Sequence, residues 1–136
     1  MAVFEWTQRM TVGVTRFDDE HRTLIAVGNR LVEALQANRD RQDIAVVVDE
    51  LVADTLSHCA NEEAALQQTA YPYFDRHREE HQALNRQVLE IQRKYQAGSG
   101  PVLSLDVMNF LKFWLANHIQ ATDTLYGPYL NGEGQH

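Results

Sequence analysis

Four stretches of helical periodicity, separated by short breaks, place the strongest constraint on what this chain can fold into. They cover residues 18–37, 42–68, 74–96 and 104–122, where apolar side chains recur at spacings of three and four. Short connections make successive helices antiparallel neighbours. The pattern therefore predicts an all-α fold, an antiparallel up-down-up-down four-helix bundle, formed by a single domain over residues 1–136.

The breaks between these segments carry ordinary turn and loop signals. Residues 38–41 read Asn-Arg-Asp-Arg, a polar turn, and Pro72 stops a helix because proline lacks the backbone donor. Residues 97–101, Ala-Gly-Ser-Gly-Pro, form the strongest loop signal in the chain. We expect an extended N-terminal arm over residues 1–17 and a flexible tail over residues 131–136.

Composition narrows the classes of partner. The formal net charge of −7 argues against nucleic acid, which needs a basic face, and against an anionic membrane surface. The first ten residues carry charges and no apolar run, and no stretch approaches the roughly 20 apolar residues that span a bilayer. We therefore expect a cytoplasmic protein, a monomer or weak oligomer, that binds neither nucleic acid nor a membrane.

Histidine placement is the feature that points to chemistry. The chain has six histidines. Five of them fall on the predicted inward stripes, and each of the four helices supplies at least one: His21, His58, His77, His81 and His118. The pairs His58 and Glu62, and His77 and His81, are each four residues apart, so the members of a pair lie on one helix face. One metal ion can therefore take both members of a pair.

The position of these residues along each helix agrees with a shared site. His21 and the His77–His81 pair come early in helices that run one way, whereas His58, Glu62 and His118 come late in helices that run the other way. Alternating helix directions therefore bring them to one end of the bundle. One buried histidine is commonly a hydrogen-bonded core residue, but several buried polar groups without partners would cost ~1–3 kcal/mol each. A metal removes that cost.

Asp123 is a further candidate ligand with an irregular spacing. It follows His118 by five residues, which on a regular helix places it about 140° away around the axis. Either the helix is disturbed there, for example by a π-type turn, or Asp123 is a surface residue. The spacing alone leaves both interpretations open.

The donor set favours two ions of a first-row metal. Five imidazoles and two carboxylates are too many ligands for one ion, and mixed nitrogen and oxygen donors suit iron, with manganese or zinc as alternatives. Two six-coordinate ions that share both carboxylates and one solvent oxygen keep one place open for a small ligand such as dioxygen. The Glu-x-x-His pattern of oxygen-activating bundles is absent. We infer reversible binding rather than oxidation.

These residues resemble the hemerythrin family, specifically its bacterial single-domain members. The matching pattern is Asp18-x-x-His21, His58-x-x-x-Glu62, His77-x-x-x-His81 and His118-x-x-x-x-Asp123, together with Trp6, Tyr71-Pro72 and Tyr126-Gly127-Pro128. The resemblance implies an oxo- or hydroxo-bridged pair of iron ions. It implies that three histidines hold one iron (His77, His81, His118) and two hold the iron with the open place (His21, His58). It also makes Glu62 and Asp123 the bridging ligands.

The resemblance implies an oxygen pocket as well. Its apolar wall would consist of Leu24, Trp114, Leu115 and Ile119, which also suit a plain core. Cys59 stands where the family usually has phenylalanine, so we expect extra space beside the open iron, faster ligand exchange and faster autoxidation; the alternative is a small buried hydrophobe. Glu20 stands where glutamine is common, and we interpret its charge as favourable at a helix start.

Four functions are compatible with this pattern. The first is reversible dioxygen binding for carriage, storage or supply, which is not an enzymatic function, with an electron donor as a second partner. The second is an oxygen or redox sensor. The third is a diiron enzyme that reduces peroxide or nitric oxide. Cys59 would take part in this reaction, or the reductase or peroxidase activity would be weak. The fourth is an iron-sequestering or purely structural bundle.

Overall fold

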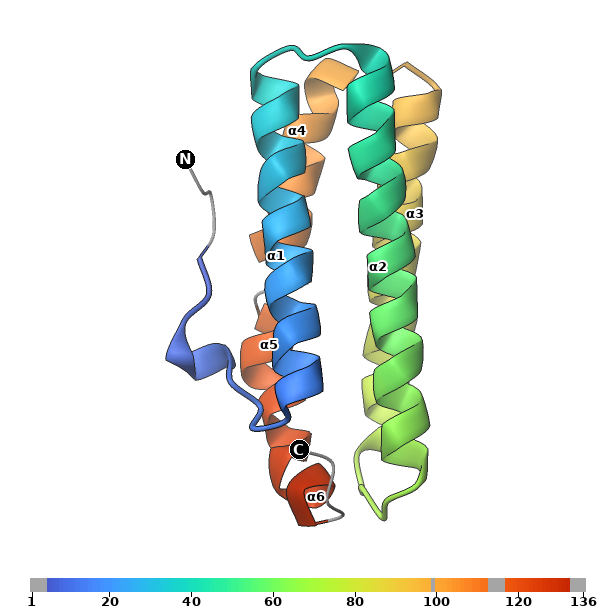
Figure 1. Ribbon diagram of the computed structural model, residues 1–136. Helices are drawn as coiled ribbons and strands as arrows, with labels where there is room; N and C mark the ends of the chain where they lie inside the picture. Colours follow the sequence, from blue (N-terminus) through green and yellow to red (C-terminus); the bar gives the residue numbers. More distant parts are fainter. Residues whose placement is uncertain (1–4, 99, 113–116, 133–136) are drawn as a thin grey trace.

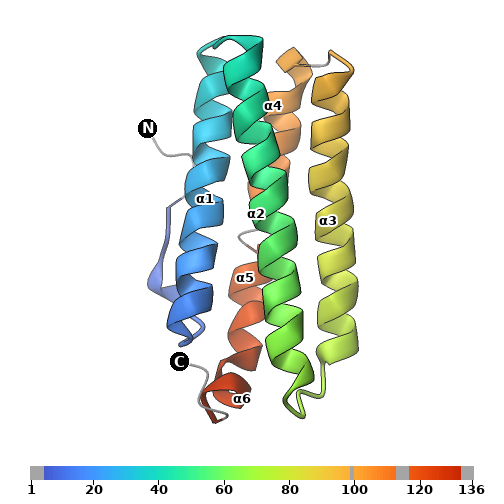
Figure 2. The ribbon, with the colours of Figure 1, turned by 45° about the vertical axis from the view of Figure 1, so that its right-hand side comes forward.

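The computed structural model describes residues 5–98, 100–112 and 117–132, and the described part is all-helical. Three long helices, α1 (Thr15–Gln36), α2 (Arg41–Gln67) and α3 (Phe74–Gln96), are followed by the shorter α4 (Gly100–Asn109) and α5 (Asn117–Ala121). Figure 1 shows α1 to α3 as neighbouring columns, and Figure 2 shows α4 and α5 following one another along a fourth column. The predicted four-helix bundle is confirmed.

Each helix packs on two neighbours around the bundle. α1 packs on α2 and α4, and α3 packs on the same two helices. The main core contains the apolar stripes that the periodicity predicted: Leu24, Leu31, Val48, Leu51, Leu84, Val88, Ile91, Val107 and Leu111. Full burial of one such side chain stabilises the fold by about 1.5–3 kcal/mol, so these stripes fix the helix rotations. None of the described helices is long and apolar enough to cross a membrane.

The fourth segment differs from the single helix predicted over residues 104–122. α4 begins at Gly100, residues 110–112 have π-helical hydrogen bonding, and helix is described again from Asn117. α1 and the π-helical residues 110–112 approach closely at Gly28, where an added Cβ would lie 2.3 Å from Leu111 Cδ2. An alanine at this position would require the Leu111 side chain to shift.

Near both ends of the described chain, more residues are helical than the sequence indicated. The arm contains a short 3-10 helix, η1 (Gln8–Met10), and α1 begins at Thr15, within the arm predicted for residues 1–17. The Val12 amide donates to Asp18 Oδ1 at 2.8 Å, which ties the arm to the first turn of α1. At the other end, η3 (Asp123–Tyr126) leads into α6 (Gly127–Gly132), so the helix extends into the tail predicted from residue 131; residues 133–136 lie outside the described part.

A second, smaller apolar cluster closes the end of the bundle where α6 lies. Its buried members come from the arm, α1, α2, the turn before α3, η3 and α6: Val12, Val14, Phe17, Leu66, Tyr71, Tyr126 and Leu130. Figure 1 places α6 and the start of α1 at this end. The cluster therefore covers the end of the bundle at which the sequence places the histidines.

Candidate metal centre

Five histidines and two carboxylates meet inside this end of the bundle. α1 supplies His21, α2 supplies His58 and Glu62, α3 supplies His77 and His81, α5 supplies His118, and η3 supplies Asp123. None of these seven residues is more than 7% exposed. The structure therefore brings together all seven residues that the sequence proposed as metal ligands.

Glu62 faces histidines on both sides. Its Oε2 lies 3.0 Å from Nε2 of His21 and 3.0 Å from Nε2 of His58. Its Oε1 lies 3.2 Å from Nε2 of His77 and 3.0 Å from Nε2 of His81. Each oxygen thus belongs to a different pair of histidines, an arrangement suited to a carboxylate that bridges two ions.

The two carboxylate oxygens of Asp123 also face different histidines. Its Oδ2 lies 2.9 Å from Nε2 of His21, whereas its Oδ1 lies 3.1 Å from Nε2 of His77 and 3.0 Å from Nε2 of His118. Two overlapping groups result, and within each the ligand atoms lie within 4.8 Å of one another: Glu62, His77, His81, His118 and Asp123; and His21, His58, Glu62 and Asp123. Either group could hold a metal ion.

The irregular spacing of Asp123 has a local structural explanation. The Thr122 amide donates to the carbonyl of His118 at 2.8 Å, and α5 ends at Ala121. The chain then tightens into η3, whose first residue is Asp123. This 3-10 turn rotates Asp123 back toward the histidines. The π-type stretch lies earlier, at residues 110–112, and the surface alternative is excluded because Asp123 is 0% exposed.

Several buried polar atoms of the cluster lack a hydrogen-bond partner. Nε2 of His58, Nε2 of His118 and both Oδ atoms of Asp123 are buried without a partner among the described residues, although the nearest nitrogen and oxygen atoms are about 3 Å apart. The atoms are close, but their directions do not suit N–H···O bonds. Unpartnered buried polar atoms are rare and often mark a missing ion. The donors and their directions therefore fit metal ligation.

The charges of the two carboxylates act strongly on the neighbouring imidazoles. Burial lowers the pKa of His58, but the charge of Glu62 and the hydrogen bond to Glu20 outweigh it and raise the pKa to about 10. Burial also opposes the positive charge of His77, yet Asp123 and Glu62 raise its pKa to about 9. In the metal-free protein these rings thus hold protons that a metal must displace.

Three groups around the cluster were not proposed as site residues from the sequence. Nδ1 of His58 lies 2.5 Å from Oε1 of Glu20, and Nδ1 of His81 lies 2.9 Å from Oε2 of Glu63. The Tyr126 hydroxyl donates to Oε2 of Glu62 at 2.5 Å. The two glutamate contacts direct Nε2 of His58 and Nε2 of His81 toward the cluster, and the tyrosine contact holds Glu62. The interpretation of Glu20 as a helix-start charge missed its contact with His58, which periodicity cannot reveal.

The predicted oxygen pocket is described only in part. Leu24, Cys59 and Ile119 are each 1% exposed and belong to the main core, whereas Trp114 and Leu115 lie outside the described residues. The Cys59 thiol is within hydrogen-bonding reach of His81, and burial raises its pKa against the opposing effect of His81. Cys59 therefore lies beside His81, which belongs to the ligand group with three histidines, and not only beside the group with two.

Comparisons with known proteins agree with this geometry. The family model described as the hemerythrin HHE cation-binding domain matches residues 12–130. A bacteriohemerythrin of Methylococcus capsulatus is 33% identical over 96% of this chain and 99% of its own length, and one of Stenotrophomonas maltophilia is 32% identical over 93% and 80%. A crystal structure of a wild-type hemerythrin matches with a TM-score of 0.85 at 33% identity, covering 95% of this chain and 98% of that chain. The chain belongs to the hemerythrin family.

Proposed function

We propose that this protein binds dioxygen reversibly at a non-haem diiron site. The observation that carries the proposal is the pair of overlapping ligand groups that share Glu62 and Asp123. Two groups joined by two carboxylates suit two ions better than one. Family membership supports the choice of iron and oxygen, since a relative that matches along 99% of its own length is a bacteriohemerythrin.

The two ions would have unequal ligand sets. His77, His81 and His118 would hold one iron, and His21 and His58 would hold the other, with Glu62, Asp123 and an oxo or hydroxo group between them. Iron bound there would supply an open coordination place and the electrons that dioxygen takes up and returns. The set with two histidines would be the one with the open place.

The surrounding residues would keep the bound gas apart from water. Leu24 and Ile119 are buried in the main core beside the cluster, and the proposed wall also includes Trp114 and Leu115. The Tyr126–Glu62 hydrogen bond holds the shared carboxylate from the end of the bundle. A dry, preorganised pocket of this kind favours release of the ligand unchanged over protonation and oxidation of the metal.

An anaerobic reconstitution with ferrous iron tests the proposal. We expect two irons per chain and a visible band that appears in air and fades under argon. As a matched comparison, Glu62→Gln should lose stoichiometric iron, because the amide cannot bridge, whereas Glu50→Gln at an exposed inter-helix pair should retain it. A band that does not reverse would favour the redox sensor or the reductase, and less than stoichiometric iron in the unsubstituted protein would overturn the diiron site.

A further inference from the structure

Three of the five clustered histidines have a partly exposed glutamate near their Nδ1 atom. Nδ1 of His58 is 2.5 Å from Glu20, and Nδ1 of His81 is 2.9 Å from Glu63. Nδ1 of His118 is 3.9 Å from Glu80, which is too long for a hydrogen bond. The side chains of these glutamates are 24%, 25% and 33% exposed, in the order Glu20, Glu63 and Glu80. His58 and His81 therefore have a glutamate at hydrogen-bond distance from Nδ1, whereas the glutamate near His118 is farther away.

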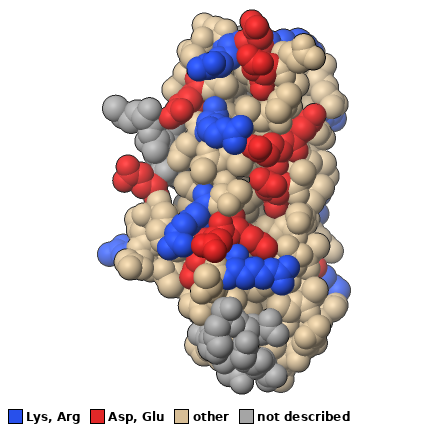
Figure 3. Space-filling view, in the orientation of Figure 1, with Lys and Arg blue, Asp and Glu red and all other residues tan. Residues whose placement is uncertain are grey.

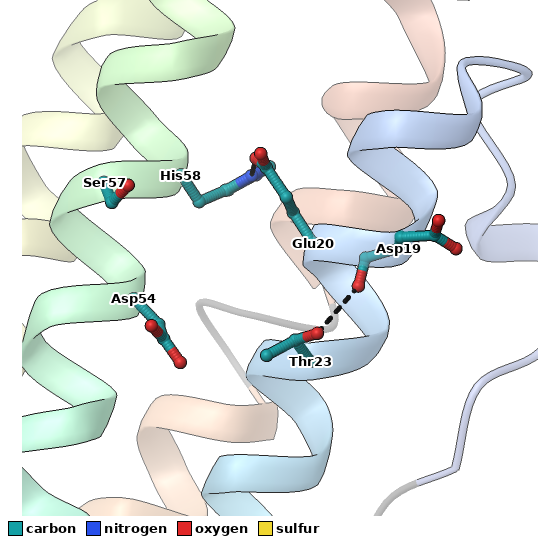
Figure 4. Close-up of a pocket in the computed structure, with 6 residues that line it drawn as sticks. All are labelled: Asp19, Glu20, Thr23, Asp54, Ser57 and His58. Atoms are coloured by element: carbon teal, nitrogen blue, oxygen red, sulfur yellow. Dashed lines mark hydrogen bonds and ion pairs between the residues drawn. The ribbon is translucent and has the colours of Figure 1, made fainter.

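Glu20 is held in place from more than one side. Asn61 Nδ2 donates to its Oε2 at 3.1 Å, and Arg16 Nε lies 3.5 Å from the same oxygen. Glu20 projects from α1 toward His58 on α2, as Figure 4 shows. The two residues line a pocket of about 200 Å³ together with Asp19, Thr23, Asp54 and Ser57. The carboxylate thus keeps its charge at the edge of solvent while one oxygen faces the buried ring.

The contact is asymmetric within the two-histidine group. His58 has a carboxylate partner on Nδ1, whereas Nδ1 of His21 is buried without a hydrogen-bond partner in the part of the chain that the structure describes. An imidazole that donates Nδ1–H to a carboxylate becomes a more basic ligand through Nε2 and has a fixed tautomer and ring direction. Stronger donation stabilises the more oxidised state of a bound metal.

We propose that Glu20 is a positioning residue that orients His58 and, through it, lowers the reduction potential of the two-histidine metal site. The inference rests on the proposed diiron function. Glu63 takes the corresponding role toward His81 at the three-histidine site. Each glutamate therefore acts on one of the two metal positions.

Zinc and cobalt titrations of the full-length, metal-free protein test this without iron chemistry. The variants are Glu20→Gln, which keeps an acceptor and removes the charge, Glu20→Ala, which removes both, and Glu63→Gln for the other site. Glu50→Gln is the control, since its partner is Arg30 and no histidine. We expect Glu20→Ala to weaken one of two zinc-binding steps about 10–100-fold, with a smaller loss in Glu20→Gln.

Cobalt spectra and iron potentials identify the site that changes. In the cobalt protein, Glu20→Gln should shift the exchangeable Nδ1–H proton signal that His58→Asn abolishes, and Glu63→Gln should leave that signal in place. In the iron protein, Glu20→Gln should raise the reduction potential and slow formation of the ferric state. Zinc affinities, proton signals and potentials equal to those of Glu50→Gln would overturn the role of Glu20. Binding of a single metal by the unsubstituted chain would instead overturn the diiron proposal.

Discussion

At the scale of single residues, the cluster depends on hydrogen bonds that come from outside the helix stripes. Tyr126 is 0% exposed, and its hydroxyl donates to Glu62, the carboxylate that faces four histidines. A hydrogen bond to a buried charge contributes about 1.5–3 kcal/mol to stability. Both the stability and the orientation of the shared carboxylate should therefore depend on this one hydroxyl.

We expect Tyr126→Phe to lower the free energy of unfolding of the metal-free protein by about 1.5–3 kcal/mol and to weaken zinc binding. Urea unfolding and a zinc titration with a competing chelator measure the two effects. Tyr95→Phe is the matched control, because the Tyr95 hydroxyl donates to the carbonyl of Arg41 at 2.8 Å, and neither residue belongs to the cluster. Zinc binding by Tyr126→Phe that equals binding by Tyr95→Phe would contradict the role given to the hydroxyl.

Cys59 provides a second test at the residue scale. The sequence predicts that a larger side chain here slows both ligand release and autoxidation, and the structure places the thiol in the closed core beside His81. Cys59→Phe should therefore release oxygen more slowly in stopped-flow experiments and accumulate the ferric form more slowly. Overpacking should also cost about 1–3 kcal/mol of stability, so far-UV circular dichroism must first confirm the fold. Unchanged rates in a folded variant would refute the idea that space at this position sets them.

At the scale of secondary-structure elements, close contacts without side chains set how the elements meet. A Cβ at Gly127 would lie 2.3 Å from the carbonyl oxygen of Val12, so the N-terminal arm crosses the start of α6 in van der Waals contact. The φ of Gly127 is −48°, which any residue can adopt. Space for the arm, and not backbone conformation, therefore requires glycine at this position.

Gly127→Ala should destabilise the protein by about 1–3 kcal/mol, because a backbone atom of the arm must move and the Val12–Asp18 hydrogen bond moves with it. Gly28→Ala should lose less. Its clash is with the terminal methyl group of Leu111, which can shift, and alanine favours a helix by about 1 kcal/mol over glycine. Urea midpoints of the two variants give the comparison. An equal or larger loss of stability in Gly28→Ala would show that the arm can move away from α6 at little cost.

At the scale of the whole molecule, the metal site and the fold depend on each other. The clustered ligands come from four helices and from η3, so a metal would join elements that are far apart in the chain. Acidic and basic side chains are interspersed on the face of the molecule shown in Figure 3. The Arg30–Glu50 pair, which joins α1 and α2, is exposed and contributes at most about 1 kcal/mol. We therefore expect the part of the free energy of unfolding that changes with bound metal and with pH to come mainly from the buried cluster.

Zinc should raise the melting temperature of the metal-free protein, by an amount equivalent to about 2.7 kcal/mol when free zinc is 100 times the dissociation constant. The gain should grow from about pH 6 to about pH 9. With pKa values of about 10 for His58 and about 9 for His77, their protonated rings stabilise the metal-free fold at low pH and compete with the metal. Differential scanning fluorimetry across this range measures the effect. A gain that stays constant with pH would mean that binding releases no protons from these rings.

The sequence by itself determined the bundle and the set of residues that meet at one end of it. Spacings of three and four fix which face of a helix is buried, and alternating helix directions then bring His21, His58 and His118 to one level. Both properties are local or follow from chain order. The tertiary structure decided the rest, because it joins residues with no shared periodicity. Glu20 meets His58 across 38 residues, and Tyr126 meets Glu62 across 64.

The position of Asp123 shows the same division at one residue. Its five-residue spacing from His118 allows two interpretations, since a regular helix would turn the side chain away from that histidine. The end of α5 at Ala121 and the 3-10 turn that follows decide between them. A turn of this kind depends on how the chain packs at the end of the bundle, against the arm and the cluster around Tyr126, and these contacts exist only once the helices have come together.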